Sequence, residues 1–276
     1  MNSEEYCRDR AAPPGSSLYY ATLYHPPQER RRLHALFALC REVEETAHES
    51  RDPGLVRLKL EWWRNELAQI RSGPRQHPVS AELQAIAVPG TGGDMARLDN
   101  FIAALLAHWE TPAAADYEHW IESLERGYGE FWRQAGAVCG VEDGGRPSVL
   151  ARGGALLGAF DELRNLGPGL AGGRCVVPTR HMNAHGLTAD RLAAGTPADA
   201  VASLLRDMLG RLRTDFRDQD RLLRRPPVKR LLCCRIMLRL AAALCAELER
   251  DPLSLLNKRT ALTPVRKLWI AWRTKL

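Results

Sequence analysis

The sequence lacks the features that mark several common classes of protein. It has no run of about 18 apolar residues, so we expect no helix that crosses a membrane. The opening MNSEEYCRDRAAPPGSS is polar, so no signal peptide is expected. The 7 cysteines form no CxxC pair, which argues against a zinc site and a disulfide framework. These absences predict a soluble, cytoplasmic protein with free thiols.

Strand signals and linkers are also scarce. The one β-like run, CVVP at 175–178, is too short to found a sheet. No Ser/Gly-rich linker and no internal repeat divides the chain. We therefore expect one domain over residues 1–276, with residues 1–15 poorly ordered. The turn-rich segment 72–94 is expected to be weakly ordered as well.

Helical periodicity is the dominant pattern. Apolar residues recur at spacings of three and four over 28–50, 54–71, 95–109, 199–223 and 229–250. In the second of these segments the expected core stripe is Leu58, Trp62 and Leu67. This periodicity predicts an all-α protein.

Basic residues exceed acidic residues by 39 to 33, which gives a formal net charge of +6. This excess permits contact with diphosphates, anionic lipid or nucleic acid without selecting among them. No nucleic-acid-binding module is visible, so nucleic acid is not expected as a partner. The basic runs at 30–32 and 224–230 are typical of solvated faces, and the alternative is peripheral contact with an anionic membrane.

The stretch CREVEETAHE at 40–49 carries the densest cluster of chemically active side chains. On a helix Glu44, Glu45 and His48 project together, because residues three and four apart share a face. Carboxylates gathered in this way can hold Mg²⁺ against a substrate diphosphate. The alternative is a solvated charged face, which is the commoner origin of such a cluster.

The surrounding residues resemble the squalene/phytoene synthase family of head-to-head prenyl transferases. Segment 16–49 matches the family's opening element at Ser17, Tyr19, Pro26, Pro27, Arg31, Ala38, Cys40 and Arg41. Later segments resemble it at LKLEWWRNEL (58–67), LRNLGPGLAGGRCVVP (163–178) and NKRTALTPVRKLWIAWR (257–273). The resemblance implies an isoprenoid-synthase-type helical bundle around a central cavity that holds an isoprenoid diphosphate or lipid. It also implies that 28–50 and 145–166 face each other across this cavity.

The family's two aspartate-rich motifs are altered in this chain. The three aspartates of the first motif correspond to Glu44, Glu45 and His48. The asparagine and two aspartates of the second motif correspond to Asp161, Asn165 and Gly169. Pro168, between two glycines, predicts an early end to the second-motif helix, since proline inside a helix costs about 3 kcal/mol or more.

These replacements weaken the expected metal site. Mg²⁺ requires near-octahedral oxygen coordination at roughly 2.0–2.1 Å, and imidazole prefers softer metals. The remaining candidate metal ligands are Glu44, Glu45 and Asp161. We assign no catalytic residue, and Mg²⁺ is expected as a cofactor only if the protein is an active enzyme.

The resemblance also implies phosphate contacts. The candidates are Tyr19, Arg41, Arg164 and Arg174, since arginine can bind phosphate bidentately without a metal. The alternative for these arginines is ion pairing within the protein, for example between Arg41 and Glu44 or Glu45.

The leading hypothesis is a pseudoenzyme that retains the cavity, binds an isoprenoid or other lipid, and acts through a protein partner. A divergent branch of the family, the phytoene-synthase-like assembly factors of mitochondrial respiratory complex I, also lacks the aspartates, and the Trp-Arg-Thr ending at 272–274 is similar to it. The alternative is an active Mg²⁺-dependent prenyl transferase that condenses two prenyl diphosphates.

Overall fold

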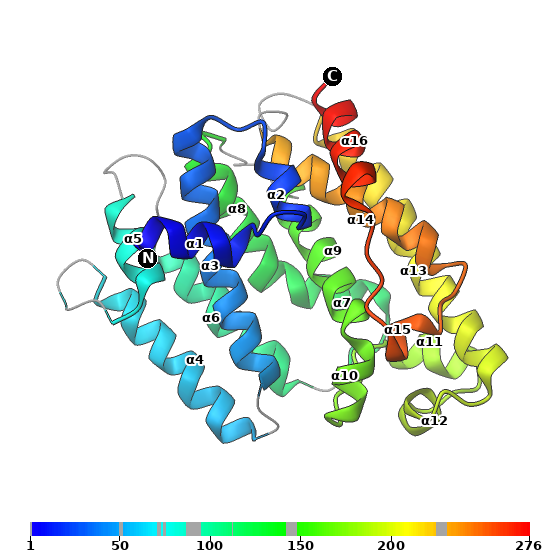
Figure 1. Ribbon diagram of the computed structural model, residues 1–276. Helices are drawn as coiled ribbons and strands as arrows, with labels where there is room; N and C mark the ends of the chain where they lie inside the picture. The colour runs from blue at the N-terminus through cyan, green and yellow to red at the C-terminus, as the bar shows by residue number, and fades with distance from the viewer. Residues whose placement is uncertain are drawn as a thin grey trace.

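The computed structural model is an assembly of helices (Figure 1). It describes residues 2–49, 52–70, 73, 76–86, 95–111, 113–141, 148–224 and 231–276, without the side chains of 47–49, 53, 95 and 96. Within these ranges there is no strand, and 175–178 is coil or bend. The all-α prediction is therefore confirmed. In the segment expected to be weakly ordered at 72–94, residues 72, 74, 75 and 87–94 lie outside the described residues, and the described part contains the short helix Pro78–Ala85. Nearly all of the basic run at 224–230 lies outside the described residues as well.

The long helices lie where the periodicity places them. In chain order the elements are α1 (Ser3–Ala11), α2 (Ser17–Thr22), α3 (Pro27–Glu49), α4 (Pro53–Ala68), α5 (Pro78–Ala85), α6 (Met95–Glu110), α7 (Tyr117–Leu124), the π-helical turn η1 (Glu125–Gly129), α8 (Glu130–Val138), α9 (Val149–Arg164), α10 (Leu166–Ala171), α11 (Thr179–Ala184), α12 (Ala189–Ala193), α13 (Ala198–Leu222), α14 (Leu232–Leu248), α15 (Ser254–Asn257) and α16 (Pro264–Lys275). No helix of the described chain is long and apolar enough to span a membrane.

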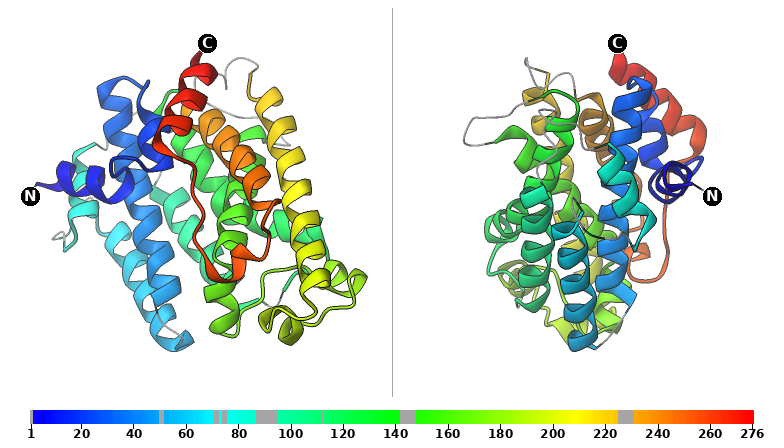
Figure 2. Two further views of the ribbon diagram at one scale, coloured as in Figure 1. Left: turned by 45° about the vertical axis from the view of Figure 1, so that its right-hand side comes forward. Right: turned by 90° about the vertical axis from the view of Figure 1, so that its left-hand side faces the viewer.

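Helix α9 lies near the centre of the bundle (Figures 1 and 2). It packs against α7, η1 and α8 on one side and against α13 and α14 on the other. Helix α3 packs against α8 and is covered by α1, α4 and α5. One continuous cluster of buried side chains connects these helices, with the largest fully buried residues being Trp120, Tyr117, Phe101, Phe131 and Phe216. Burying each such ring contributes roughly 1.5–3 kcal/mol.

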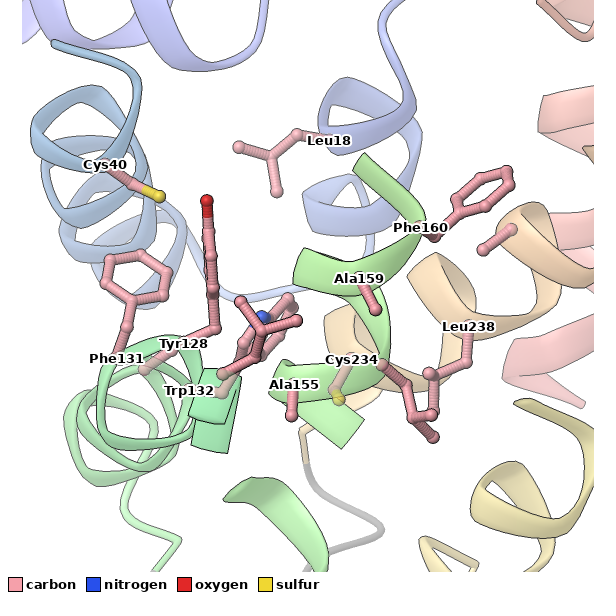
Figure 3. Packing of buried hydrophobic residues seen from close by; sticks show 14 of the residues in the cluster. Leu18, Cys40, Tyr128, Phe131, Trp132, Ala155, Ala159, Phe160, Cys234 and Leu238 are labelled. Atoms are coloured by element: carbon pink, nitrogen blue, oxygen red, sulfur yellow. The ribbon is translucent and has the colours of Figure 1, made fainter. Parts of the chain in front are cut away.

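Two glycines of α9 determine how closely the neighbouring aromatic residues approach it. A Cβ atom at Gly158 would lie 2.4 Å from Cδ2 of Tyr128, and one at Gly154 would lie 2.5 Å from Cδ1 of Trp132. Both rings therefore pack directly on the backbone of α9, and Figure 3 shows them between α9 and α3. The glycines position Tyr128 and Trp132 at the centre of the molecule.

The N-terminal residues differ from the expectation of poor order. Residues Ser3–Ala11 form α1, and Asn2 and Glu5 form a capping box at its start. Cys7 and Ala11 are buried against α3 and α5. The segment carries too few apolar residues for hydrophobic periodicity to reveal it, so the capping residues were the available signal.

The core stripe predicted along 54–71 is wrong at two of its three positions. Leu67 is buried, but Leu58 is 64% exposed and Trp62 is 37% exposed. Helix α4 buries Val56 and Trp63 instead. Apolar residues occur on both faces of this helix, and periodicity does not indicate which face is covered.

Candidate functional site

A cavity of about 510 Å³ lies between α3 and α9. Its apolar lining includes Leu18, Phe37, Phe131, Trp132, Leu157, Met237, Leu240 and Leu244. Its charged and amide lining consists of Arg41, Glu44, Glu45, Asp161, Arg164, Asn165, Arg259 and Lys267. The two motif helices thus face one cavity, as predicted, and the cavity combines an apolar interior with a cluster of charges.

Glu44 of α3 and Asp161 of α9, one carboxylate from each motif helix, both line this cavity. The Tyr128 hydroxyl donates a hydrogen bond of 2.8 Å to Glu44, and Figure 3 shows the Tyr128 ring extending toward α3. Burial, followed by the nearby charge of Asp161, raises the pKa of Glu44 to about 7. Near neutral pH a substantial fraction of Glu44 therefore carries a proton.

The second glutamate of the first motif is already paired. Arg10 of α1 donates through Nη2 to Glu45 and through Nε, at 2.7 Å, to Glu42. The Tyr6 hydroxyl also donates to Glu42 at 2.8 Å. Glu45 lines the cavity, but a cation outside the cavity lining compensates its charge. The sequence did not reveal this pairing, because α1 was not expected.

Four cations line the cavity. Arg41 comes from α3, Arg164 from α9, Arg259 from the segment before α16, and Lys267 from α16 itself. The nearest carboxylate contact of Arg164 is Asp161, at 3.8 Å. Within the described residues no ion pair is found for Arg41, so the alternative reading, in which Arg41 pairs with Glu44 or Glu45, is not found.

The cations also disfavour one another. Burial lowers the pKa of Arg164; Asp161 opposes this effect, while Arg259 and Arg41 add to it. Burial and the charge of Arg164 lower the pKa of Lys267, whose Nζ donates to the Gly15 carbonyl at 2.8 Å. A bound anion would relieve this mutual repulsion.

Arg259 and Lys267 were missed by the sequence analysis. Both lie in the segment 257–273 that resembles the family's closing helix. Lys267 falls on the face of α16 opposite its exposed tryptophans and is buried. Because a surface helix normally turns its apolar stripe toward the core, the sequence pattern places Lys267 in solvent and gave no signal for it.

The other predicted phosphate contacts do not line the cavity. Tyr19 is 38% exposed, and its ring packs edge-on against Tyr20. Arg174 donates to Glu162 at 2.9 Å and lies over the Trp109 ring.

The remaining positions of the second motif contribute little charge. Asn165 lines the cavity, but its amide donates to Asp161 at 3.3 Å. Gly169 lies on α10, outside the cavity lining. The side chain of His48 in the first motif lies outside the described residues.

A closed polar cluster surrounds Glu162 on the other side of α9. Its carboxylate accepts hydrogen bonds from Trp120, at 2.9 Å, and from Arg174, and it pairs with His108 at 2.8 Å. Burial alone would raise the pKa of Glu162, but His108 and then Arg174 and Trp120 hold it at about 2. This carboxylate stays charged because three donors compensate it.

The chain after Arg164 breaks as the glycine–proline sequence predicts. Helix α9 ends at Arg164, Asn165 links it to the short α10, and Pro168 lies within α10. A Cβ atom at Gly167 would lie 2.1 Å from the Leu256 carbonyl oxygen, so α10 and α15 require glycine there to pack. The last position of the second motif is carried away from the cavity.

Comparison with known proteins now identifies the family. The family model described as squalene/phytoene synthase matches residues 11–266. The chain belongs to the squalene/phytoene synthase family. No curated protein sequence matches it significantly.

Solved structures share the fold of this family member. The crystal structure of squalene synthase HpnC from Alicyclobacillus acidocaldarius matches with a TM-score of 0.72 and 20% identity, over 90% of this chain and 94% of that one. A dehydrosqualene synthase in complex with ligand matches with a TM-score of 0.75 and 15% identity, over 99% and 95%. The predicted isoprenoid-synthase-type bundle is confirmed.

The family implies a magnesium–diphosphate site, and the residues of this member do not fit it. Arg10 compensates Glu45, Asn165 is uncharged, and Gly169 has no side chain. Only Glu44 and Asp161 remain as a facing pair of carboxylates at the cavity. Mg²⁺ held between two facing clusters needs several more carboxylate oxygens than this pair provides. The cavity has the charge of an anion site rather than that of a metal clamp.

A different group of ligand-type side chains lies close together, away from the cavity lining. Among the described residues, His25, Glu29 and Cys139 are the group of three whose ligand atoms approach within 4.8 Å of one another. The backbone N–H of Cys233 donates to Nε2 of His25 at 3.1 Å, so in the neutral ring Nδ1 carries the proton. That proton is directed to Glu29 at 3.0 Å, which accounts for the group as a hydrogen bond within the fold.

Proposed function

We propose that the protein binds a prenyl diphosphate, or a lipid of the same chemistry, in the cavity between α3 and α9 without carrying out metal-dependent prenyl transfer. The observation that supports this most directly is the set of four cations, Arg41, Arg164, Arg259 and Lys267, beside an apolar interior. A diphosphate would neutralise the cations, and an isoprenoid tail would occupy the apolar part.

The loss of chemistry follows from the altered carboxylates. Ionising an allylic diphosphate requires strong electrostatic stabilisation of the leaving group, usually the largest catalytic contribution. Here Glu44 has a raised pKa, Glu45 is paired with Arg10, and Asn165 and Gly169 carry no charge. Guanidinium groups can hold a diphosphate in its ground state without ionising it.

We further propose that the protein acts through a partner, as an accessory or assembly factor, like the complex I assembly factors that the sequence resembles. The replaced aspartates support this proposal, since a protein that keeps a ligand without the reaction must act by another route. The free thiols support the cytoplasm as its location.

A binding and turnover experiment tests this function. Farnesyl diphosphate is titrated into the purified protein by calorimetry, once with EDTA and once with Mg²⁺, and diphosphate release is followed in parallel. We expect similar affinity in both buffers and no release above background. Farnesol serves as the control without phosphate charge, and it should bind at least roughly tenfold more weakly, since charge-assisted hydrogen bonds contribute roughly 1.5–3 kcal/mol each.

The alternative function is an active Mg²⁺-dependent prenyl transferase, and one observation favours it. Glu44 and Asp161 lie close enough across the cavity for the charge of one to raise the pKa of the other. A cation between them would relieve that repulsion. Mg²⁺-dependent turnover by the unmodified protein, abolished by Glu44→Gln, would establish this function and overturn the pseudoenzyme proposal.

A further inference from the structure

Helix α16 presents its apolar face to solvent. Val265, Leu268, Trp269 and Trp272 share one face by helical spacing, and Trp269 and Trp272 are 52% and 50% exposed. The opposite, buried face carries Lys267, Ala271 and Thr274. A helix on the surface of a globular protein normally turns its apolar stripe toward the core. In α16 the orientation is reversed.

The exposed stripe of α16 is flanked by positive charge. The helix contains no acidic residue, and Arg266, Arg273 and Lys275 are exposed beside the stripe. Arg273 lies over the Trp269 ring, 5.1 Å from its centre, while Lys275 lies over Tyr24. Arg266 pairs with Glu247 of α14. For Arg273 and Lys275 no carboxylate partner is found among the described residues.

Helix α16 also forms part of the wall of the cavity. Lys267 on its inner face and Leu262 just before it line the cavity. Helix α2 packs beside α16, as Figures 1 and 2 show, and contributes Leu18 to the same lining. Helix α16 thus has the cavity on the side of Lys267 and solvent on the side of Trp269 and Trp272.

We propose that α16 docks the protein on the surface of an anionic lipid bilayer. Trp269 and Trp272 enter the interface between headgroups and acyl chains, where indole rings are favoured. Arg273 and Lys275 contact the anionic headgroups on either side of the stripe. This docking requires no ligand in the cavity, so it stands apart from the proposed function.

A second exposed stripe in the molecule provides a matched control. Helix α4 exposes Leu55, Leu58 and Trp62, and it lies well away from α16 in Figure 1. Two of its arginines are held by carboxylates of α6, in the pairs Arg57–Glu110 and Arg64–Asp99. Helix α4 therefore combines exposed apolar side chains with balanced charge, whereas α16 combines them with excess positive charge.

Vesicle flotation tests the proposal on the full chain. The protein is mixed with vesicles of phosphatidylcholine alone or with added phosphatidylglycerol. We expect binding to the anionic vesicles only, weakened by salt. The double variant Trp269→Ser/Trp272→Ser should bind anionic vesicles at least roughly tenfold more weakly than the wild type. We expect a loss of the same size for Arg273→Gln/Lys275→Gln. Leu58→Ser with Trp62→Ser should leave binding unchanged.

Further measurements separate docking from folding and from the cavity. Each variant is checked by circular dichroism and by farnesyl diphosphate titration, which should match wild type if the exposed side chains act only at the membrane. Quenching of tryptophan fluorescence by brominated lipid should be lost in the Trp269/Trp272 variant. Unchanged vesicle binding by that variant would overturn the proposal. If the wild type does not bind anionic vesicles, the proposal is also overturned. If sedimentation equilibrium then shows dimers that the Trp269/Trp272 variant abolishes, the exposed face of α16 is assigned to contact with a second copy of the chain.

Discussion

Two polar clusters lie on opposite sides of α9, and their charges are arranged differently. Around Glu162, one carboxylate is enclosed by His108, Trp120 and Arg174, so every charge has a partner inside the fold. At the cavity, burial together with Arg259 and Arg41 lowers the pKa of Arg164, and burial together with Arg164 lowers the pKa of Lys267. The first cluster is complete without a ligand. The second lacks negative charge, which a ligand would supply.

The largest expected effect is on the closed cluster. Glu162→Gln leaves the cations of a buried network without their carboxylate, so we expect the free energy of unfolding to fall by roughly 3–5 kcal/mol. Urea denaturation at neutral pH measures this loss. A loss below about 1 kcal/mol would mean that Glu162 is not the centre of a stabilising network.

The same substitution should change the acid sensitivity. The pKa of Glu162 is about 2 in the folded protein against an ordinary value of 4.5, so between these values the unfolded state binds more protons. The contribution of Glu162 to stability is therefore present above pH 4.5 and is lost as pH falls toward 2. Glu162→Gln should remove this part of the acid dependence.

The next effect is on ligand affinity at the charges that line the cavity around Arg164, Glu44 and Asp161, here called the open cluster. Arg164→Gln should weaken farnesyl diphosphate binding roughly ten- to a hundredfold, because a charge-assisted hydrogen bond contributes roughly 1.5–3 kcal/mol. Stability should not fall, since burial lowers the pKa of Arg164 and its nearest carboxylate contact is 3.8 Å away. Calorimetric titration and urea denaturation measure the two quantities.

Arg174→Gln is the matched control and should give the opposite result. Arg174 donates to Glu162 rather than to the cavity, so its loss should lower stability and leave affinity unchanged. Equal affinities of the Arg164 variant and wild type would contradict the assignment of the open cluster to a diphosphate.

A smaller effect concerns pH at the open cluster. The pKa of Glu44 is about 7 in the folded protein against an ordinary 4.5, so the folded state binds more protons between these values. Stability contributed by protonated Glu44 is present below pH 4.5 and is lost as pH rises through 7. We expect Glu44→Gln to gain on wild type by on the order of 1–3 kcal/mol over this range. Denaturation curves of both proteins at about pH 4.5 and about pH 8, which bracket the titration, check the gain. An equal stability difference between variant and wild type at both pH values would contradict it.

The smallest effect is expected from repairing the second motif. Asn165→Asp with Gly169→Asp should leave diphosphate release at background, because position 169 lies on α10 outside the cavity lining. Ligands that act as a unit are strongly non-additive, so isolated repairs add little. A coupled assay for diphosphate with Mg²⁺ measures this, and turnover by the double variant would show that the break after Arg164 does not prevent a clamp.

The sequence predicted the fold because helical periodicity is a local property. It also placed Arg41, Glu44, Asp161 and Arg164 at one site through their match to the family motifs, and the structure brings these four to one cavity. It could not predict which arginines are already paired. Arg174 is held by Glu162 twelve residues earlier, across the break in α9, and no spacing rule covers that contact.

Contacts between segments that are far apart in the sequence could not be predicted either. Arg10 reaches Glu45 from a helix with few apolar residues, and Lys267 reaches the cavity from the end of the chain. Hydrophobic periodicity also shows which residues share the apolar face of a helix, but not whether that face is turned toward the core or toward solvent. The stripes of α4 and α16 both turn outward, although the same spacing elsewhere turns inward.

The two glycines of α9 have a consequence for the size of any guest molecule. Tyr128 and Trp132 line the cavity, and they lie as far back as they do because positions 154 and 158 have no side chain. A methyl group added at Gly154, which is not part of the lining, would lie 2.5 Å from both the Trp132 ring and the Tyr128 carbonyl oxygen, so α9 and the chain that carries these two residues would have to move apart. The backbone of α9 at positions 154 and 158 therefore determines where this wall of the cavity lies, whereas Arg41, Arg164, Arg259 and Lys267 determine its positive charge. A substitution at either glycine should therefore change the shape of the cavity without changing its charge.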